Sequence, residues 1–139
     1  MIYAVIDTNV FVSALLSHNS DAATVKVVEA ISENGLCPLY NQEIIAEYKD
    51  VLCRPKFGFP PQSIEAILNI IQTIGVYADR VHSSEFFPDE DDIVFYEVAI
   101  SKEDSYLVTG NTKHFPCTPI VVTPAEMVEI LNEKGLLKK

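Results

Sequence analysis

The sequence lacks any apolar run long enough to cross a membrane, since none approaches the roughly 20 residues that a spanning helix needs. Its amino terminus also lacks a basic region followed by the apolar core of a secretory signal. We therefore expect no membrane association and a cytoplasmic location.

Cysteine is scarce, with only Cys37, Cys53 and Cys117 in the chain. Three cysteines at wide spacings form neither a redox motif nor a metal knuckle, so we interpret them as reduced structural residues. His114 and Cys117 are close enough in sequence to supply half of a zinc site, but the sequence offers no second pair of ligands. The sequence therefore gives no support for structural zinc.

Basic side chains are outnumbered, with ten lysines and arginines against twenty acidic residues and a formal net charge of −10. This balance argues against binding of nucleic acid by broad neutralisation of its phosphates. The objection is weaker if several acids converge on divalent cations, because bound cations reverse the local field and attract phosphate. Solubility alone explains most of the charge.

The chain does have enough apolar residues for a sizeable core. At 139 residues, of which 48% are hydrophobic, it suits one domain, residues 1–139. Residues 2–6 form an unbroken apolar run, typical of a central parallel strand buried on both faces. Further apolar segments alternate with segments of helical periodicity, which favours an α/β fold with a mostly parallel sheet of four to five strands.

The predicted strands are 2–6, 36–40, a brief extended piece at 76–78, 106–109 and 120–122. The predicted helices are 10–16, 22–33, a helix capped by Asn41 that stops before Pro55, one from near Pro61 to residue 74, 93–100, and one that opens with the capping box Thr123 to Glu126. Open sheets of this kind bind ligands beyond the carboxyl ends of their strands, so we expect the functional site there.

Three carboxylates do not fit a purely structural interpretation. Asp7 ends the first strand at the edge where ligands bind, although capping the next helix explains it equally well. Glu47 lies on the margin of the apolar stripe of its helix, with no basic partner on the same sector. Asp92 is the last acid of the run 89–92 before a helix that is apolar almost all the way round; alone, such a run is an ordinary complement to a helix dipole.

If these three acids converge, their mutual repulsion requires a cation to keep them ionised. Oxygen ligands without histidine or cysteine suit magnesium or manganese. Such a site can activate water and stabilise charge on a phosphodiester. The residues themselves therefore point to hydrolysis of RNA or DNA at a metal site of Asp7, Glu47 and Asp92.

The order and spacing of these segments resemble the PIN domain over nearly the whole chain. The matching segments are Ile6-Asp7-Thr8-Asn9-Val10, the helix of Glu47 ending in Val51-Leu52-Cys53-Arg54-Pro55-Lys56-Phe57, Asp91-Asp92 with Ala99, and Tyr106-Leu107-Val108-Thr109-Gly110-Asn111 followed by His114-Phe115. They are most similar to single-domain bacterial PIN proteins grouped with the toxins of toxin–antitoxin pairs. The resemblance implies a three-layer α/β/α fold and a metal-dependent endoribonuclease in which water attacks the phosphodiester.

By position, Asp7, Glu47 and Asp92 match three acids of the family's metal site. Asn111 departs from the pattern, because many relatives have aspartate there as a fourth acid. Its amide oxygen can still ligate a metal or orient a metal-bound water, so we include Asn111 among the catalytic residues. The lost negative charge favours one firmly held metal over two.

The resemblance also assigns residues around the acids. Thr8 and Asn9 match polar support of the site, and Thr109 matches a hydroxyl beside it. We place Asn9 and Thr109 among the substrate-binding residues together with Arg54 and Lys113, which with Lys56 are the basic residues nearest the crevice and can steer a phosphate. Each of these cations is equally explained as ordinary surface charge.

Two further polar residues are not assigned to the chemistry. His114 is better explained by packing or a local hydrogen bond than by catalysis. Asp104 precedes the strand that Asn111 follows, so we expect it at the opposite end of the sheet as a solvated turn residue.

We predict a magnesium- or manganese-dependent endoribonuclease, the toxin of a toxin–antitoxin pair, with an RNA substrate. As the resemblance implies, we also expect an antitoxin protein in the crevice and a homodimer. The alternative is a PIN-like regulatory protein that binds RNA or protein with impaired catalysis, which Asn111 and the net charge of −10 motivate. A phosphatase or a response-regulator receiver fits poorly, because no aspartate-x-aspartate follows the first strand and no lysine follows the late strand in the manner of a receiver.

Overall fold

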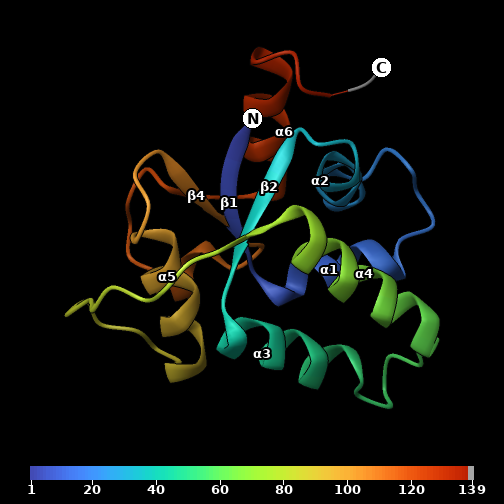
Figure 1. Ribbon diagram of the computed structural model, residues 1–139, viewed down its shortest axis with the longest axis horizontal. Helices are drawn as coiled ribbons and strands as arrows, with labels where there is room; N and C mark the ends of the chain where they lie inside the picture. The colour runs from blue at the N-terminus through green and yellow to red at the C-terminus, as the bar shows by residue number, and fades with distance from the viewer. Residues whose placement is uncertain (138–139) are drawn as a thin grey trace.

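A sheet of five parallel strands forms the centre of the computed structural model, which describes residues 1–137 (Figure 1). The strands are β1 (Ile2–Ile6), β2 (Leu36–Tyr40), β3 (Val76–Tyr77), β4 (Ser105–Val108) and β5 (Val121–Val122). Their order across the sheet is β3-β2-β1-β4-β5. The chain builds β2 and β3 on one side of β1 and then returns to build β4 and β5 on the other. A reversal of this kind opens a crevice at the carboxyl ends of β1 and β4.

Helices cover both faces of the sheet. They are α1 (Thr8–Leu16), α2 (Ala23–Ser32), α3 (Gln42–Leu52), α4 (Pro61–Ile74), α5 (Ile93–Ala99) and α6 (Pro124–Glu133), with 3-10 turns η1 (Glu90–Asp92) and η2 (Thr112–His114). Helix α5 packs against β1 and β4, whereas α2 and α4 pack against β2 and against each other. In Figure 1, α5 lies to the left of β1, and α2 and α4 lie to its right. The predicted three-layer α/β/α fold is confirmed.

The elements form where the sequence predicts them, with small shifts at their ends. Strand β1 is buried except at Tyr3, which is partly exposed, and Ala4, Val5 and Ile6 are fully covered. The capping box is present, since Thr123 and Glu126 exchange side-chain to backbone hydrogen bonds of 2.9 and 3.1 Å. Helix α1 begins at Thr8 rather than at residue 10, so it starts directly after Asp7.

An aromatic cluster under the crevice joins three of the helices to the sheet. The Tyr48 ring of α3 lies edge-on to Phe11 of α1 at 5.1 Å and 6.0 Å from Phe95 of α5, measured between ring centroids. The buried Tyr48 hydroxyl donates a hydrogen bond to the backbone carbonyl of Ile6, the last residue of β1. These contacts fix α3 against the end of β1, where the acids lie.

Within residues 1–137, no helix combines the length and the apolar character that a membrane crossing requires.

Helix α3 is held at its start by Asn41, whose buried Oδ1 accepts a 2.8 Å hydrogen bond from the Ile44 amide. We expect Asn41→Ala to lower the free energy of unfolding by about 1 kcal/mol, because the cap is lost. Asn41→Ser, which keeps a capping oxygen, should retain most of the stability. Urea unfolding of the two variants and wild type measures the difference, and equal losses in both variants would contradict the capping role.

Candidate metal centre

Asp7 lies directly after β1, at the point where the strand order reverses, and is only 7% exposed. Its Oδ2 accepts hydrogen bonds from Thr109 Oγ1 at 2.7 Å and from Asn9 Nδ2 at 3.2 Å. Asp7 occupies the N-cap position of α1, yet its side chain makes no capping hydrogen bond. The capping explanation of Asp7 is therefore wrong, because the carboxylate is turned toward the loop after β4.

A second set of hydrogen bonds ties that loop to the loop after β1. Thr109 Oγ1 accepts from the Asn111 amide at 2.9 Å, and Asn9 Oδ1 accepts from the Gly110 amide at 3.2 Å. Thr109 is fully buried, so its hydroxyl is directed at Asp7 and is not exposed to a substrate. Asn111 is exposed and its backbone amide is held by Thr109, and it lines a small pocket together with Asn9 and Gly110.

Asp92 enters the same region from the start of α5. Its side chain is 15% exposed, and Asp92 Oδ2 is a buried oxygen without a hydrogen-bond partner in the described part of the chain. His114 Nδ1 lies 3.3 Å away, but the arrangement of the two groups is not that of a hydrogen bond. Burial, followed by the negative charges of Asp7 and Asp89, raises the pKa of Asp92 to about 6, against the opposing effect of His114.

Glu47 approaches from α3 and is half-buried, beside Tyr48. Burial raises the pKa of Glu47, and the charges of Asp91, Asp50 and Asp7 raise it further, while Arg54 lowers it. Burial also raises the pKa of Asp7, although the Thr109 hydrogen bond offsets part of the effect. Three carboxyls from three separate elements are thus placed where their negative charge is disfavoured.

The charge of Asp7 acts on both Glu47 and Asp92, but the three acids do not form a closed set of ligands. In residues 1–137, no three histidine, cysteine, aspartate or glutamate side chains are grouped closely enough to hold a metal ion. The donor chemistry nevertheless fits a hard divalent cation, since the available groups are carboxylate oxygens. Asp92 Oδ2 and the buried Thr8 hydroxyl have no hydrogen-bond partner within the described residues, although His114 Nδ1 lies 3.3 Å from the former, and a cation with its water shell would satisfy both atoms.

The remaining predicted residues are placed at different distances from the acids. Arg54 lies at the end of α3 and pairs with Asp50 at 3.3 Å, close enough to act on the charge of Glu47. Lys113 lines a neighbouring pocket with Phe115, Cys117 and Glu126. None of the three acids lines that pocket.

Asp104 lies in the turn before β4, exposed and with a φ of 59°, at the opposite end of that strand from Thr109. The prediction for Asp104 is confirmed.

A linkage between α3 and α5 was missed by the sequence reasoning. Arg80 donates to Glu97 of α5 through Nε at 2.8 Å and also bonds to Glu43 of α3 at 2.6 Å. Glu97 is 5% exposed and also accepts from the Ser83 amide at 2.7 Å. Burial alone would raise the pKa of Glu97, but these donors outweigh it and lower the pKa. The signal in the sequence is Glu97 itself, a lone charge in an apolar helix that must have a partner.

Comparison with known proteins gives one match. A family model described as PIN domain matches residues 3–113. This range runs from β1 through β4 and includes all three acids and Asn111. Searches of curated proteins and of solved structures returned no match.

The Arg80 linkage predicts unequal effects of removing its two halves. Arg80→Ala should lower the free energy of unfolding by about 1–3 kcal/mol, because buried Glu97 loses its charged donor. Glu43→Gln, which breaks only the exposed half, should cost less than about 1 kcal/mol. Chemical denaturation of both variants provides the measurement, and similar losses would show that the buried half is not the stabilising one.

The raised pKa of Asp92 predicts that this residue destabilises the metal-free protein at neutral pH. Its folded-state pKa of about 6 lies above the unfolded value, so ionisation above pH 6 opposes folding, and the penalty disappears as pH falls toward 4. With chelator at pH 7.5, Asp92→Asn should therefore unfold at a higher temperature than wild type. The difference should shrink as pH is lowered to 5. A variant that is less stable than wild type at pH 7.5 would contradict this reasoning.

Proposed function

Because the chain belongs to the PIN domain family, whose members are generally nucleases that use divalent metals, we propose that it is a magnesium- or manganese-dependent endoribonuclease. The observation that carries the proposal is the position of Asp7 at the crevice where the strand order reverses, with its charge acting on both Glu47 and Asp92. Burial raises the pKa of each carboxyl, a pattern that is concentrated at functional sites.

Each side chain has a distinct task in this proposal. Asp7, Glu47 and Asp92 would hold the cation, which when bound polarises a phosphodiester and activates water. Asn9 and Thr109 orient Asp7 through its Oδ2. Asn111 has its backbone fixed by Thr109, so its exposed amide can hydrogen-bond a water or a phosphate oxygen at the crevice.

We further assign the chain to the toxin type of PIN protein, on the strength of the sequence segments that resemble those toxins. Under this proposal a homodimer and a small antitoxin are its protein partners. An antitoxin that offers a basic side chain to the crevice would relieve the repulsion among the acids, as a cation does. RNA is then the substrate that the antitoxin displaces.

The second function is a regulatory protein that binds RNA or protein with impaired catalysis. Two observations favour it: Asn111 stands where many relatives have an acid, and the three acids are not closed into a ligand set. The net charge of −10 points the same way. Metal-dependent turnover distinguishes the two hypotheses, because only the nuclease should show it.

The test is cleavage of labelled single-stranded and structured RNAs with magnesium, with manganese and with chelator. Asp7→Asn and Asp92→Asn should each slow cleavage at least about 100-fold, because the cation contributes several kcal/mol to the transition state and 1.4 kcal/mol corresponds to a factor of ten. Asp104→Asn is the matched control, since it makes the same change at the far end of β4 and should cleave at the wild-type rate.

Equal cleavage by all four proteins would reveal a contaminating nuclease and reject the assigned site. Absence of cleavage by folded wild type with either metal would reject the nuclease hypothesis and favour the regulatory one.

A further inference from the structure

The last turn of α3 and the loop between α3 and α4 concentrate positive charge in an acidic protein. Lys49, Arg54 and Lys56 lie within eight positions of each other, although the whole chain has only ten lysines and arginines. In the described residues neither Lys49 nor Lys56 forms a salt bridge, and Arg54 pairs only with exposed Asp50. The cations of this loop are therefore available to an external anion.

The same loop presents a stacked pair of aromatic rings. Phe57 and Phe59 lie parallel, with ring centroids 5.3 Å apart and an interplanar angle of 9°, and Lys56 Nζ is 5.1 Å from the Phe57 centroid. Gly58 between them has a φ of 63°, a conformation that disfavours a side chain. A Cβ at Gly58 would meet no atom within 4 Å, so backbone conformation and not space requires glycine there.

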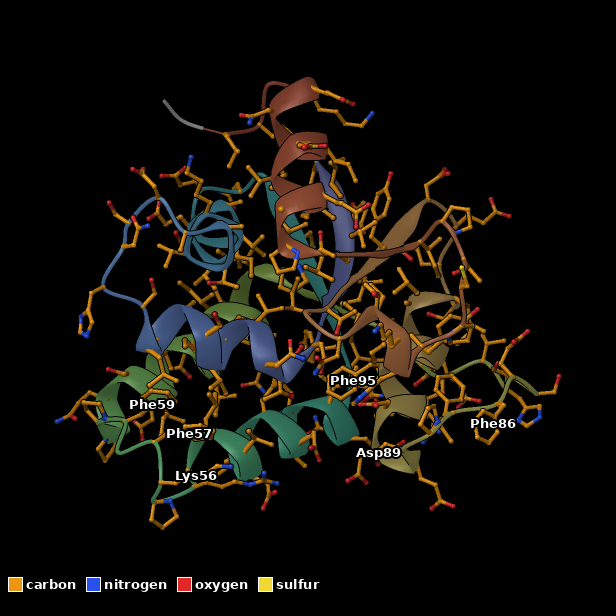
Figure 2. All side chains as sticks on the ribbon, turned by 180° about the vertical axis from the view of Figure 1, so that it is seen from behind. Lys56, Phe57, Phe59, Phe86, Asp89 and Phe95 are labelled. Atoms are coloured by element: carbon orange, nitrogen blue, oxygen red, sulfur yellow. The ribbon has the colours of Figure 1, made fainter. Side chains whose placement is uncertain are left out.

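The two rings differ in how they are anchored. Phe59 packs against the hydrophobic core, whereas Phe57 is not among the described residues that do so. Figure 2 shows Lys56, Phe57 and Phe59 together toward one end of the molecule, with Phe86 toward the other and Asp89 between them. Because Phe57 packs against Phe59 and not against the core, its half-exposed ring can stack against a ligand.

Phe59, the inner ring of the pair, lines a pocket of about 360 Å³, a volume within the size range of small-ligand sites, while Phe57 lies outside its lining. Its apolar lining includes Leu52, Pro55, Phe59, Ile64 and Leu68, and its polar lining includes Lys49, Arg54 and Glu65. The pocket thus combines an aromatic wall with cations and one carboxylate.

We propose that this loop and pocket bind a nucleotide of single-stranded RNA, with its base against the Phe57–Phe59 pair and its phosphate at Lys49, Arg54 and Lys56. The inference rests on the proposed endoribonuclease function, because it places the strand that leads into the acidic crevice. Aromatic rings stack with any base, and cations contact the phosphates. Glu65 is the acceptor for an amino group on the base edge.

The position of the loop relative to the acids supports an RNA strand that runs from the loop into the crevice. Arg54, two residues beyond the end of α3, acts on the charge of Glu47, and five residues of helical rise, about 8 Å, separate Glu47 from Leu52 at the end of the helix. A strand that binds the loop therefore reaches the crevice within a few nucleotides. The loop supplies the positive charge that the acidic crevice lacks, so substrate affinity and metal chemistry are located on two neighbouring surfaces.

The test measures binding separately from cleavage. Binding of a short fluorescent single-stranded RNA of mixed sequence is followed by anisotropy with magnesium, in an Asp7→Asn background that prevents cleavage. Phe57→Leu keeps an apolar side chain but removes the stacking face, so it should raise Kd about five-fold or more. Lys56→Ala should reduce the slope of log Kd against log salt by about 0.7, the value for one phosphate contact on a single strand.

Matched controls make the same changes elsewhere. Phe86→Leu alters a phenylalanine that is 84% exposed, and Lys102→Ala removes a lysine that lies over the Tyr3 ring at 4.4 Å. Phe86→Leu should change Kd less than Phe57→Leu does, and Lys102→Ala should change the salt slope less than Lys56→Ala does. The Phe57 effect should also be absent for the same RNA in a duplex, because its bases are not free to stack.

Several results would overturn the proposal. These are a Kd for Phe57→Leu equal to that of Phe86→Leu, an equal effect on duplex RNA, or no binding of single-stranded RNA at all. Binding of an oligoglutamate peptide that depends on Phe57, with RNA binding unaffected, would assign the loop to a protein partner instead.

The outcome is separable from that of the nuclease test. Binding that depends on Phe57, without cleavage by wild type, would keep the loop site and reject the nuclease. Metal-dependent cleavage by wild type, with unchanged RNA binding in both loop variants, would keep the nuclease and reject the loop site.

Discussion

A carboxylate held away from water is the constraint on which the candidate site depends. Asp7 follows a strand buried on both faces, so its charge is placed where solvation is poor. Thr109 and Asn9 compensate in part, and the same two side chains bind the loop after β4. Asp92 and Glu47 then add negative charge nearby instead of removing it. Three carboxylates that disfavour one another's ionisation are explained if a bound cation offsets their repulsion.

Much of this architecture follows from local sequence patterns. The apolar run before Asp7 predicts β1, and the capping residues Asn41 and Thr123 mark helix starts that the structure confirms. Parallel strands that alternate with helices place their carboxyl ends together, so convergence of Asp7 and Thr109 follows from topology. Periodicity also identifies Glu47 as a residue at the edge of the core, where the structure places it half-buried.

Other features depend on contacts between segments far apart in the chain, which local patterns do not report. The sequence left open whether Asp7 caps α1, and only the position of Thr109 decides it. The partner of Glu97 lies in an irregular segment without periodicity, so Arg80 could not be identified from spacing. Likewise, Phe57 and Phe59 resemble core residues in the sequence, and only the fold shows that one of them is not packed against the core.

The hydrogen bond from Tyr48 to the Ile6 carbonyl has a consequence for sequence divergence. This bond and the rings around Tyr48 fix the rotation of α3 about its own axis, and with it the direction of Glu47. Phenylalanine could fill the same space but would leave a buried carbonyl without a partner. Homologous chains can therefore vary the exposed positions of α3 freely, whereas exchange of this tyrosine demands a compensating donor elsewhere. Tolerance to mutation along α3 should thus be uneven from one residue to the next, with its minimum beside the acid.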